Sequence, residues 1–292
     1  MPPDPRLRIA VDPSSTALLV LSRRGLLDRM LANIGLRVTW VESADRRQTA
    51  GLLADDEIDF GGAGVLAPIH AQAAGADLVY VAHSPPREER ASILTRRDAG
   101  LGRVTDLAGR RIALSVGSSD ELVLAGALAD SGLRIGDVAR VNLARQAGYA
   151  ALARGAVDAW VAAEPAVGPG ATEVLRGTSR VIGHRAVWFA TRRLAERRPD
   201  AIDVIQAALR EADAWIGAHL DDAAALFAEH VPGATPGAHW RRRLAHRRPG
   251  LEPISAAFVA EQQRVADLLA AHGLIPRGVA VADALLPGAA RA

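Results

Sequence analysis

The sequence contains no lysine and no cysteine, so all 35 of its basic side chains are arginines. Without lysine the protein has no Schiff-base chemistry, no pyridoxal-phosphate aldimine and no standard P-loop. Without cysteine it has no thiol nucleophile, no disulfide and no thiolate-bound metal. The eight histidines show neither HxxxH nor HExxH spacing, so we predict no metal site and no cofactor.

Long apolar runs are also missing. No stretch reaches the ~20 apolar residues that span a bilayer, and residues 1–6 carry no apolar leader and no cleavage site. We therefore expect no membrane span and a cytoplasmic protein, or a periplasmic or extracellular one if a leader has been removed. The formal net charge of +2 among 292 residues does not indicate a nucleic-acid-binding protein. The arginine-rich stretch at 240–248 is expected to be a solvated helix face or a partner surface.

Short β-branched runs alternate with helical patterns, which is typical of βα units and a largely parallel sheet. In the first part of the chain, strands are predicted at 8–11, 36–41, 58–60 and 78–82, and helices at 18–33, 48–54 and 65–74. Further strands are predicted at 111–114, 139–143 and 159–163. Beyond Pro199 the pattern is helical, over 199–218, 221–229, 236–246 and 255–272.

A Ser-Pro-Pro segment over 84–89 interrupts this pattern and predicts a crossover between two lobes. We expect lobe I to comprise residues 1–84 and 188–292, and lobe II to comprise residues 85–187. The chain is predicted to return to lobe I near 187–190.

Several segments, in collinear order, resemble the aliphatic-sulfonate-binding proteins of bacterial ABC importers. These segments are AQAAGADLVYVAH at 71–83, DLAGRRIAL at 106–114, GAVDAWV at 155–161, EQQRVAD at 261–267 and GLIP at 273–276. The resemblance implies a periplasmic-binding-protein type II fold: α/β, two-lobed, with two crossover segments and a helical C-terminal part. It also implies that the ligand lies between the lobes and that amides at a helix N-terminus recognise its anionic group.

The predicted anion site is the stretch Gly117, Ser118 and Ser119, which follows a strand and opens a helix. Glycine lets the backbone approach a ligand, and the first-turn N–H groups and the helix dipole favour an anion. The alternative is that Ser118 or Ser119 only caps the helix.

Two further segments, both in lobe I, are predicted to line the ligand site. Gly62, Ala63 and Gly64 precede the helix at 65–74, where a glycine cluster permits close backbone approach or simply forms a tight turn. Ser14 and Ser15 follow the first strand and are expected to contact the ligand, although Ser15 or Thr16 alternatively caps the next helix. The resemblance favours the ligand-binding interpretation of the glycine stretch.

Carboxylates lie at these positions, and compared with the family that the chain resembles, Asp12 and Glu121 stand where polar, aromatic or neutral residues or histidine are usual, whereas Glu164 stands at an acidic position of that family. Asp12, Glu121 and Glu164 fall at or just beyond strand ends, the edge at which open α/β sheets bind ligands. They are candidate general bases, and they suggest that the ligand carries an amine opposite its sulfo group. Asp120 is a candidate ligand-binding residue or a helix-stabilising carboxylate.

Two more side chains complete the candidate set. His83, at the crossover, is a candidate catalytic residue or part of the scaffold. Trp188, near the return, is expected to close over the ligand or to pack in the core.

These features favour a cytosolic enzyme on a sulfonate-binding scaffold. It would bind a small amino sulfate ester or sulfonate and eliminate sulfate as the amine closes a small ring, with no covalent nucleophile. A cysteine-dependent desulfinase is excluded. One alternative is the substrate-binding component of an ABC importer for aliphatic sulfonates. The second alternative is a cytosolic binding subunit or sensor that acts with a partner protein, and no reading includes nucleic acid.

Overall fold

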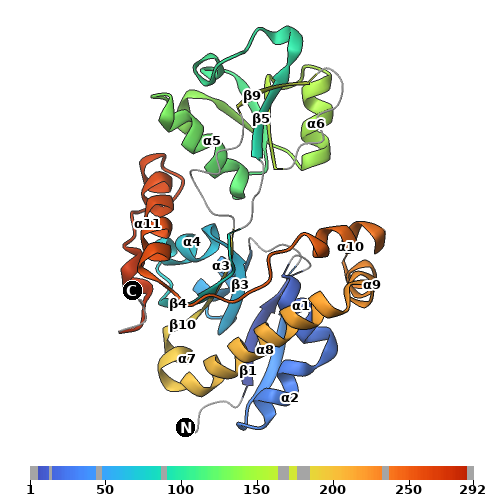
Figure 1. Cartoon of the computed structure of the whole chain (residues 1–292). Helices are drawn as coiled ribbons and strands as arrows, with labels where there is room; N and C mark the ends of the chain where they lie inside the picture. The colour runs from blue at the N-terminus through green and yellow to red at the C-terminus, as the bar shows by residue number, and fades with distance from the viewer. Residues whose placement is uncertain are drawn as a thin grey trace. The chain divides into compact units, whose positions relative to one another are not determined.

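The structure is a computed structural model that describes residues 6–12, 15–43, 48–86, 91–163, 171–175, 185–231 and 237–287. The chain divides into two compact units (Figure 1). Unit 1 comprises Met1–Arg87, Arg185–Ala260 and Val279–Ala292, and unit 2 comprises Glu88–His184 and Glu261–Gly278.

Unit 1 contains a five-stranded sheet in the order β2-β1-β3-β10-β4. These strands are β1 (Arg6–Val11), β2 (Arg37–Glu42), β3 (Phe60–Gly64), β4 (Leu78–His83) and β10 (Ala186–Thr191). Strand β1 pairs in parallel with β2 and β3, while β10 runs antiparallel between β3 and β4. The strand that follows the return from unit 2 is therefore inserted between β3 and β4 of the first sheet.

Helices cover both faces of this sheet. The helices of unit 1 are α1 (Thr16–Arg24), α2 (Leu26–Ala32), α3 (Gln48–Ala54), α4 (Leu66–Ala74), α7 (Arg192–Arg197), α8 (Pro199–Ala218), α9 (Leu220–His230) and α10 (Gly237–Ala245), with a short 3-10 turn at Val281–Ala284. Of these, α9 and α10 pack on α8 and on each other. Adjacent residues of β3 face opposite ways, as the pleat requires. A Cβ on Gly61 would meet Thr49 of α3, and a Cβ on Gly62 would meet Leu18 of α1.

Unit 2 contains a second five-stranded sheet, in the order β7-β6-β8-β5-β9. Its strands are β5 (Ala91–Arg96), β6 (Arg111–Leu114), β7 (Ala139–Asn142), β8 (Ala159–Ala163) and β9 (Ala171–Leu175). Its helices are α5 (Ser119–Asp130) and α6 (Arg145–Ala153), with 3-10 turns at Arg97–Ala99, Val104–Leu107 and Ile135–Asp137. Ile112 and Leu114 of β6 pack in the same cluster as residues of α5, whereas Ala113 packs with residues of α6.

Helix α11 (Ala256–Ala271) begins in unit 1 and continues in unit 2. Residues 261–278, which we assigned to lobe I from the sequence, contribute Leu268 and Leu274 to the core of unit 2. The N–H of Ile135 also donates to His272 Nδ1 at 3.0 Å.

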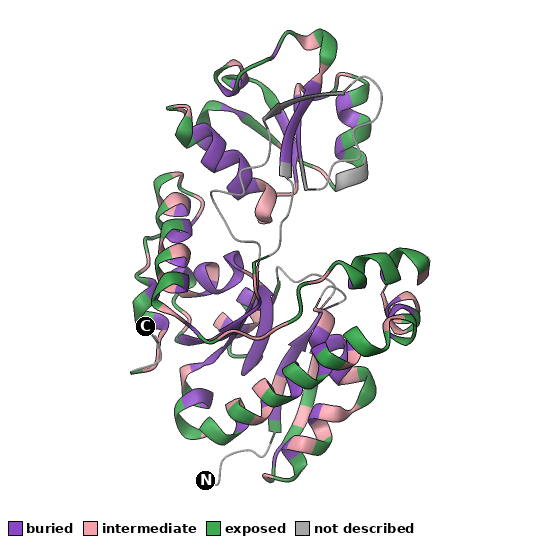
Figure 2. Ribbon diagram, in the orientation of Figure 1, coloured by how far each residue is buried: buried purple, intermediate pink, exposed green. Residues whose placement is uncertain are grey.

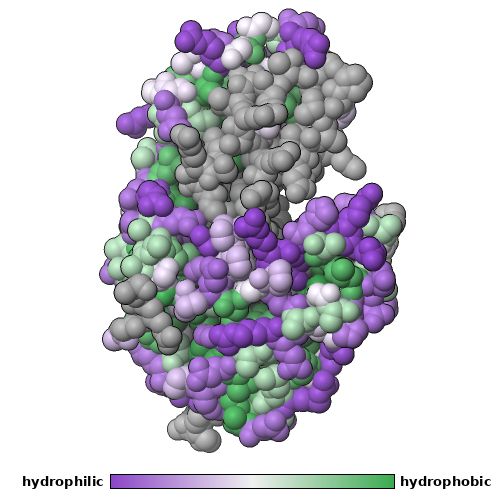
Figure 3. Space-filling view, in the orientation of Figure 1, coloured by the Kyte–Doolittle hydropathy of each residue, from purple (hydrophilic) through white to green (hydrophobic). Residues whose placement is uncertain are grey.

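Many residues of the strands are buried in both units, as the purple colour shows in Figure 2. On the visible face of unit 1, hydrophilic side chains alternate with small apolar areas (Figure 3). In the part of the chain that the structure describes, no helix combines the length and apolar character needed to cross a bilayer.

Two element predictions are wrong in detail. The single helix predicted over 18–33 is two helices, because Gly25 adopts a left-handed conformation with φ of 60° between α1 and α2. The strand predicted at 58–60 begins at Phe60 and runs through the glycines to Gly64, so these glycines lie in a strand rather than in a turn. The strands β5 and β9 and the short helix α7 were not predicted.

Candidate functional site

The loop between β6 and α5 in unit 2 has the strand–loop–helix setting that we predicted for the anion site. Gly117 has a φ of 75°, a left-handed conformation that glycine adopts without steric cost. Ser118 is the N-cap of α5: its hydroxyl accepts the N–H of Asp120 at 3.2 Å and donates to the Ser115 carbonyl at 2.6 Å. Ser118 therefore caps the helix, which is the alternative that the sequence left open.

Three successive backbone N–H groups of this loop donate to side-chain oxygens. Ser115 donates to Asp120 Oδ2 at 3.2 Å, and Val116 donates to Asn142 Oδ1 at 3.1 Å. Gly117 donates to Glu121 Oε2 at 2.7 Å, the shortest of the three distances. Two of the three acceptors are carboxylates, so this loop has the geometry to bind the oxygens of an anion.

Glu121 is buried, and its second carboxylate oxygen forms an ion pair with Nη1 of Arg140 on β7. The Arg140 side chain remains about one-third exposed. Glu121 therefore links the loop amide to an arginine at the adjacent strand. Since the carboxylate stands where a ligand anion would accept the Gly117 N–H, a ligand at this amide has to displace it.

In unit 1, Asp12 follows β1 and is buried. The Ser15 hydroxyl donates to Asp12 Oδ2 and lies 3.3 Å from the Gly62 carbonyl oxygen. Ser15 makes no side-chain cap to α1. The structure thus brings together three predicted residues, Asp12, Ser15 and Gly62, at the carboxyl end of β1, while Ser14 and Glu164 lie outside the described residues.

Gly62 is packed against Trp188, its partner across the β3–β10 pair. A Cβ on Gly62 would lie 2.8 Å from Trp188 Cδ1, closer than side chains tolerate. Trp188 is buried in the core of unit 1, which is the packing role that the sequence allowed for it. Ala63 is buried too, whereas a Cβ on Gly64 would have no atom within 4 Å. Gly64 is therefore the position of this stretch with open space beside its backbone.

Thr49 is a polar residue near this edge that the sequence analysis did not single out. It lies on α3 beside Gly61, is 1% exposed, and its hydroxyl has no hydrogen-bond partner within the described part of the chain. A buried hydroxyl without a hydrogen-bond partner is costly, so Thr49 is a polar group near this edge that the described residues leave unsatisfied. A lone threonine in a predicted helix gives no sequence signal of this kind.

His83 ends β4 and is held by contacts within unit 1. Its ring stacks on Phe258 with centroids 4.3 Å apart, and Nδ1 lies 3.0 Å from the Ser84 carbonyl and 3.2 Å from Glu252 Oε2. The backbones of His83 and Glu252 also exchange two hydrogen bonds. These contacts fit the scaffold role that the sequence left open for this residue. Within the described residues, no group of three or more His, Asp or Glu side chains is placed to hold a metal ion.

Comparison with known proteins gives matches over nearly the whole chain. The model of the family described as NMT1/THI5 like matches residues 31–223. An aliphatic sulfonates-binding protein of Escherichia coli (strain K12) is 32% identical over 278 residues, which cover 94% of this chain and 86% of that protein.

Two solved structures are similar throughout. The periplasmic aliphatic sulphonate binding protein SsuA from Escherichia coli superposes with a TM-score of 0.81 at 30% identity, over 97% of this chain and 92% of that one. The alkanesulfonate-binding protein SsuA from Xanthomonas axonopodis pv. citri, bound to MOPS, gives a TM-score of 0.77 at 32% identity, over 97% and 98%. The predicted α/β periplasmic-binding-protein type II fold is thereby confirmed.

Proposed function

The chain belongs to the NMT1/THI5-like family, and we propose that it is the substrate-binding component of an ABC importer for aliphatic sulfonates. The observation that carries this proposal is the loop before α5, where the Gly117 N–H already holds a carboxylate oxygen at 2.7 Å. A sulfonate oxygen offers the same kind of acceptor. The similarity to a sulfonate-binding protein solved with MOPS supports the same ligand class.

Binding at this loop requires an exchange of anions. The sulfonate takes the Gly117 N–H, and Glu121 gives it up while keeping its ion pair with Arg140. The exchange replaces one charge-assisted hydrogen bond with another, so the ligand gains affinity from its other contacts. The capping bonds of Ser118 hold the loop in place for either acceptor.

Glu121 also bears on which sulfonate is bound. A negative charge beside the anion site disfavours a plain alkanesulfonate and favours one that carries an ammonium group. We therefore retain an amine-bearing sulfonate as the preferred ligand within this proposal. The ammonium group of such a ligand would be attracted by the carboxylate oxygen that the Gly117 N–H releases.

Calorimetric titration of the purified protein tests the proposal. Butanesulfonate and aminoethanesulfonate are each expected to bind at a single site with a dissociation constant of about 1 μM or lower, and aminoethanesulfonate is expected to bind more tightly. Butyrate serves as the matched anion without the sulfo group and is expected to bind much more weakly. Absence of binding by both sulfonates at about 1 mM would sink the proposal.

The sulfate-eliminating enzyme that the sequence favours stays a prediction, as does its cytoplasmic location. A binding component of an importer works outside the cytoplasmic membrane, so the two proposals differ in location as well as in chemistry. Incubation with amino sulfate esters, followed by an assay for released sulfate, separates them. Turnover that Glu121→Gln abolishes would favour the enzyme, and binding without turnover favours the importer component.

A further inference from the structure

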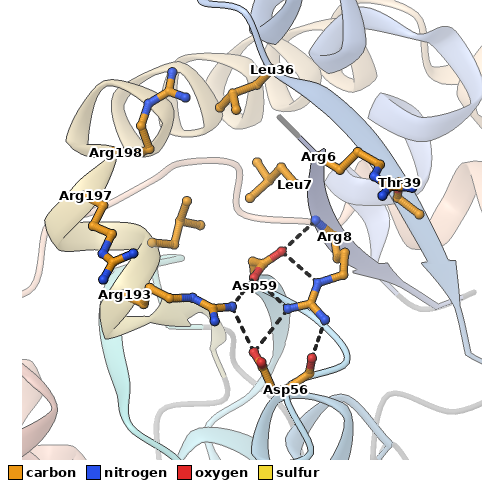
Figure 4. Close-up of a pocket in the computed structure, with 11 residues that line it drawn as sticks. Arg6, Leu7, Arg8, Leu36, Thr39, Asp56, Asp59, Arg193, Arg197 and Arg198 are labelled. Carbon is orange, nitrogen blue, oxygen red and sulfur yellow. Dashed lines mark hydrogen bonds and ion pairs between the residues drawn. The ribbon is translucent and has the colours of Figure 1, made fainter. Parts of the chain in front are cut away.

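A second candidate site lies in unit 1. It is at the amino-terminal edge of the sheet, opposite the carboxyl edge at which Asp12, Ser15 and Gly62 meet. Asp12 follows the carboxyl end of β1, whereas Arg6 begins that strand, about 20 Å away for a six-residue strand. A cavity of about 540 Å³ opens at this amino-terminal edge (Figure 4), within the size range of small-molecule sites. We call it the amino-edge pocket; it is bounded by the start of β1 and by helix α7, together with residues of β2 and of the turn before β3.

Two aspartates and two arginines of the pocket neutralise one another. Arg8 donates to both oxygens of Asp59, with Nε–Oδ2 at 3.0 Å and Nη2–Oδ1 at 2.9 Å. Arg193 of α7 reaches Asp56 Oδ1 at 3.0 Å and Asp59 Oδ1 at 3.2 Å. These bonds, drawn in Figure 4, fix both guanidinium groups and use both carboxylates that line the pocket.

The lining contains three more arginines than this network uses: Arg6, Arg197 and Arg198. Arg198 donates to Asp200 at 2.8 Å and to the Ile34 carbonyl. The side chain of Arg197 is exposed and has no hydrogen bond or ion pair to any described residue. Among the described lining residues, arginines therefore outnumber carboxylates by five to two, and the guanidinium of Arg197 is available to bind an anion.

The pocket also has an apolar part. Leu7 and Leu194 are buried core residues whose side chains line it. In Figure 4, Leu7 and Leu36 lie between the arginines of α7 on one side and Arg6 on the other. A ligand in this position would meet hydrocarbon in its middle and guanidinium groups at its edges.

We propose that the amino-edge pocket binds a small organic phosphate, a molecule with a doubly charged phosphate group on a compact apolar part. The excess of guanidinium groups over carboxylates suits a dianion better than a singly charged sulfonate. The planar guanidinium of Arg197 donates two parallel hydrogen bonds to phosphate oxygens, and the leucines contact the apolar part. This site is separate from the proposed sulfonate site and does not depend on it.

Phenyl phosphate and benzenesulfonate are a matched pair of probes, since they share a ring and differ in charge. Each is titrated into the full protein by calorimetry, with saturating butanesulfonate present throughout. Phenyl phosphate is expected to bind, and benzenesulfonate is expected to bind at least roughly tenfold more weakly. Arg197→Ala should weaken phenyl phosphate roughly tenfold, and Arg6→Ala combined with Arg197→Ala should abolish its binding.

Arg210→Ala is the control variant, because Arg210 is exposed on α8, does not line the pocket and donates a hydrogen bond to Gln206. It should leave phenyl phosphate binding unchanged, and circular dichroism verifies that all variants are folded. Two outcomes overturn the proposal: no binding of phenyl phosphate by the wild-type protein, or binding that Arg197→Ala and Arg210→Ala affect equally. Binding of butanesulfonate is read separately, so failure here leaves the proposed function intact.

Discussion

The backbone N–H of Gly117 donates to the carboxylate of Glu121 across 2.7 Å, so the amide predicted to receive a ligand anion holds one from its own helix. Glu121 is four residues further along the chain, in the first turn of α5, where a carboxylate is stabilised by the helix dipole. Arg140 secures its other oxygen. Binding at this loop is therefore a competition between two anions.

Replacing Glu121 by glutamine should raise the affinity for butanesulfonate about tenfold, because the competing charge is removed and its shape retained. The gain should be smaller for aminoethanesulfonate, whose ammonium group loses a nearby carboxylate. Calorimetric titration measures both. Asp130→Asn, at the exposed end of the same helix, controls for the general loss of one negative charge. A lower affinity for butanesulfonate in Glu121→Gln would show that Glu121 assists binding.

Gly62→Ala should lower the stability of unit 1 by about 2 kcal/mol, since the added methyl group would lie 2.8 Å from Trp188 Cδ1 and 3.3 Å from Leu18 Cδ1. The matched variant is Gly64→Ala, two residues along the same strand, where an added Cβ meets nothing within 4 Å. Thermal unfolding followed by circular dichroism compares them. Equal melting temperatures for the two variants would contradict the packing explanation for Gly62.

Ser118→Ala should destabilise α5 by about 1 kcal/mol, because the N-cap hydroxyl both accepts the Asp120 N–H and donates to the Ser115 carbonyl. Its neighbour Ser119 is the first residue of the helix and provides the control Ser119→Ala. Urea unfolding is the measurement. If Ser118 acts only as a cap, sulfonate affinity should fall little in the same variant; a larger loss of affinity than of stability would indicate direct ligand contact.

Asp59→Asn should destabilise the protein in a pH-dependent way. Burial alone would raise the pKa of Asp59, but hydrogen bonds from the Arg8 side chain and backbone, with the Arg8 charge, outweigh burial and hold this pKa below its usual value. The ionised carboxylate therefore stabilises the fold fully above the pKa of an unfolded aspartate, about 3.9, and less as the pH falls through the lower folded pKa.

The expected difference between wild type and Asp59→Asn is about 2 kcal/mol near neutral pH. It should shrink as the pH is lowered below about 3.9. Urea unfolding near neutral pH and again below about pH 3.9 measures this difference in stability. Asp203→Asn, at an exposed position of α8, serves as the comparison, and a difference that does not depend on pH would rule out ionisation as the cause.

Local interactions account for the parts of the structure that were predictable. The alternation of strands and helices, the loop at 115–118 and the capping role open to Ser118 all depend on residues within a few positions of one another. The same holds for the bond between Gly117 and Glu121, although the sequence did not show which acceptor the amide would take. The break of the first helix at Gly25 was missed because the apolar pattern continues across it.

The sequence by itself determined which chemistry is absent, since no fold supplies a missing lysine or cysteine, and it determined the order of the elements through short-range periodicity. The tertiary structure decided the rest: Trp188 lies over Gly62, Arg140 pairs with Glu121, and Arg193 meets Asp59 from 134 residues away. These contacts depend on strand register and on how helices cover the sheets. Residues distant in the chain meet only where the packing of whole elements brings them together, and no local pattern encodes that meeting.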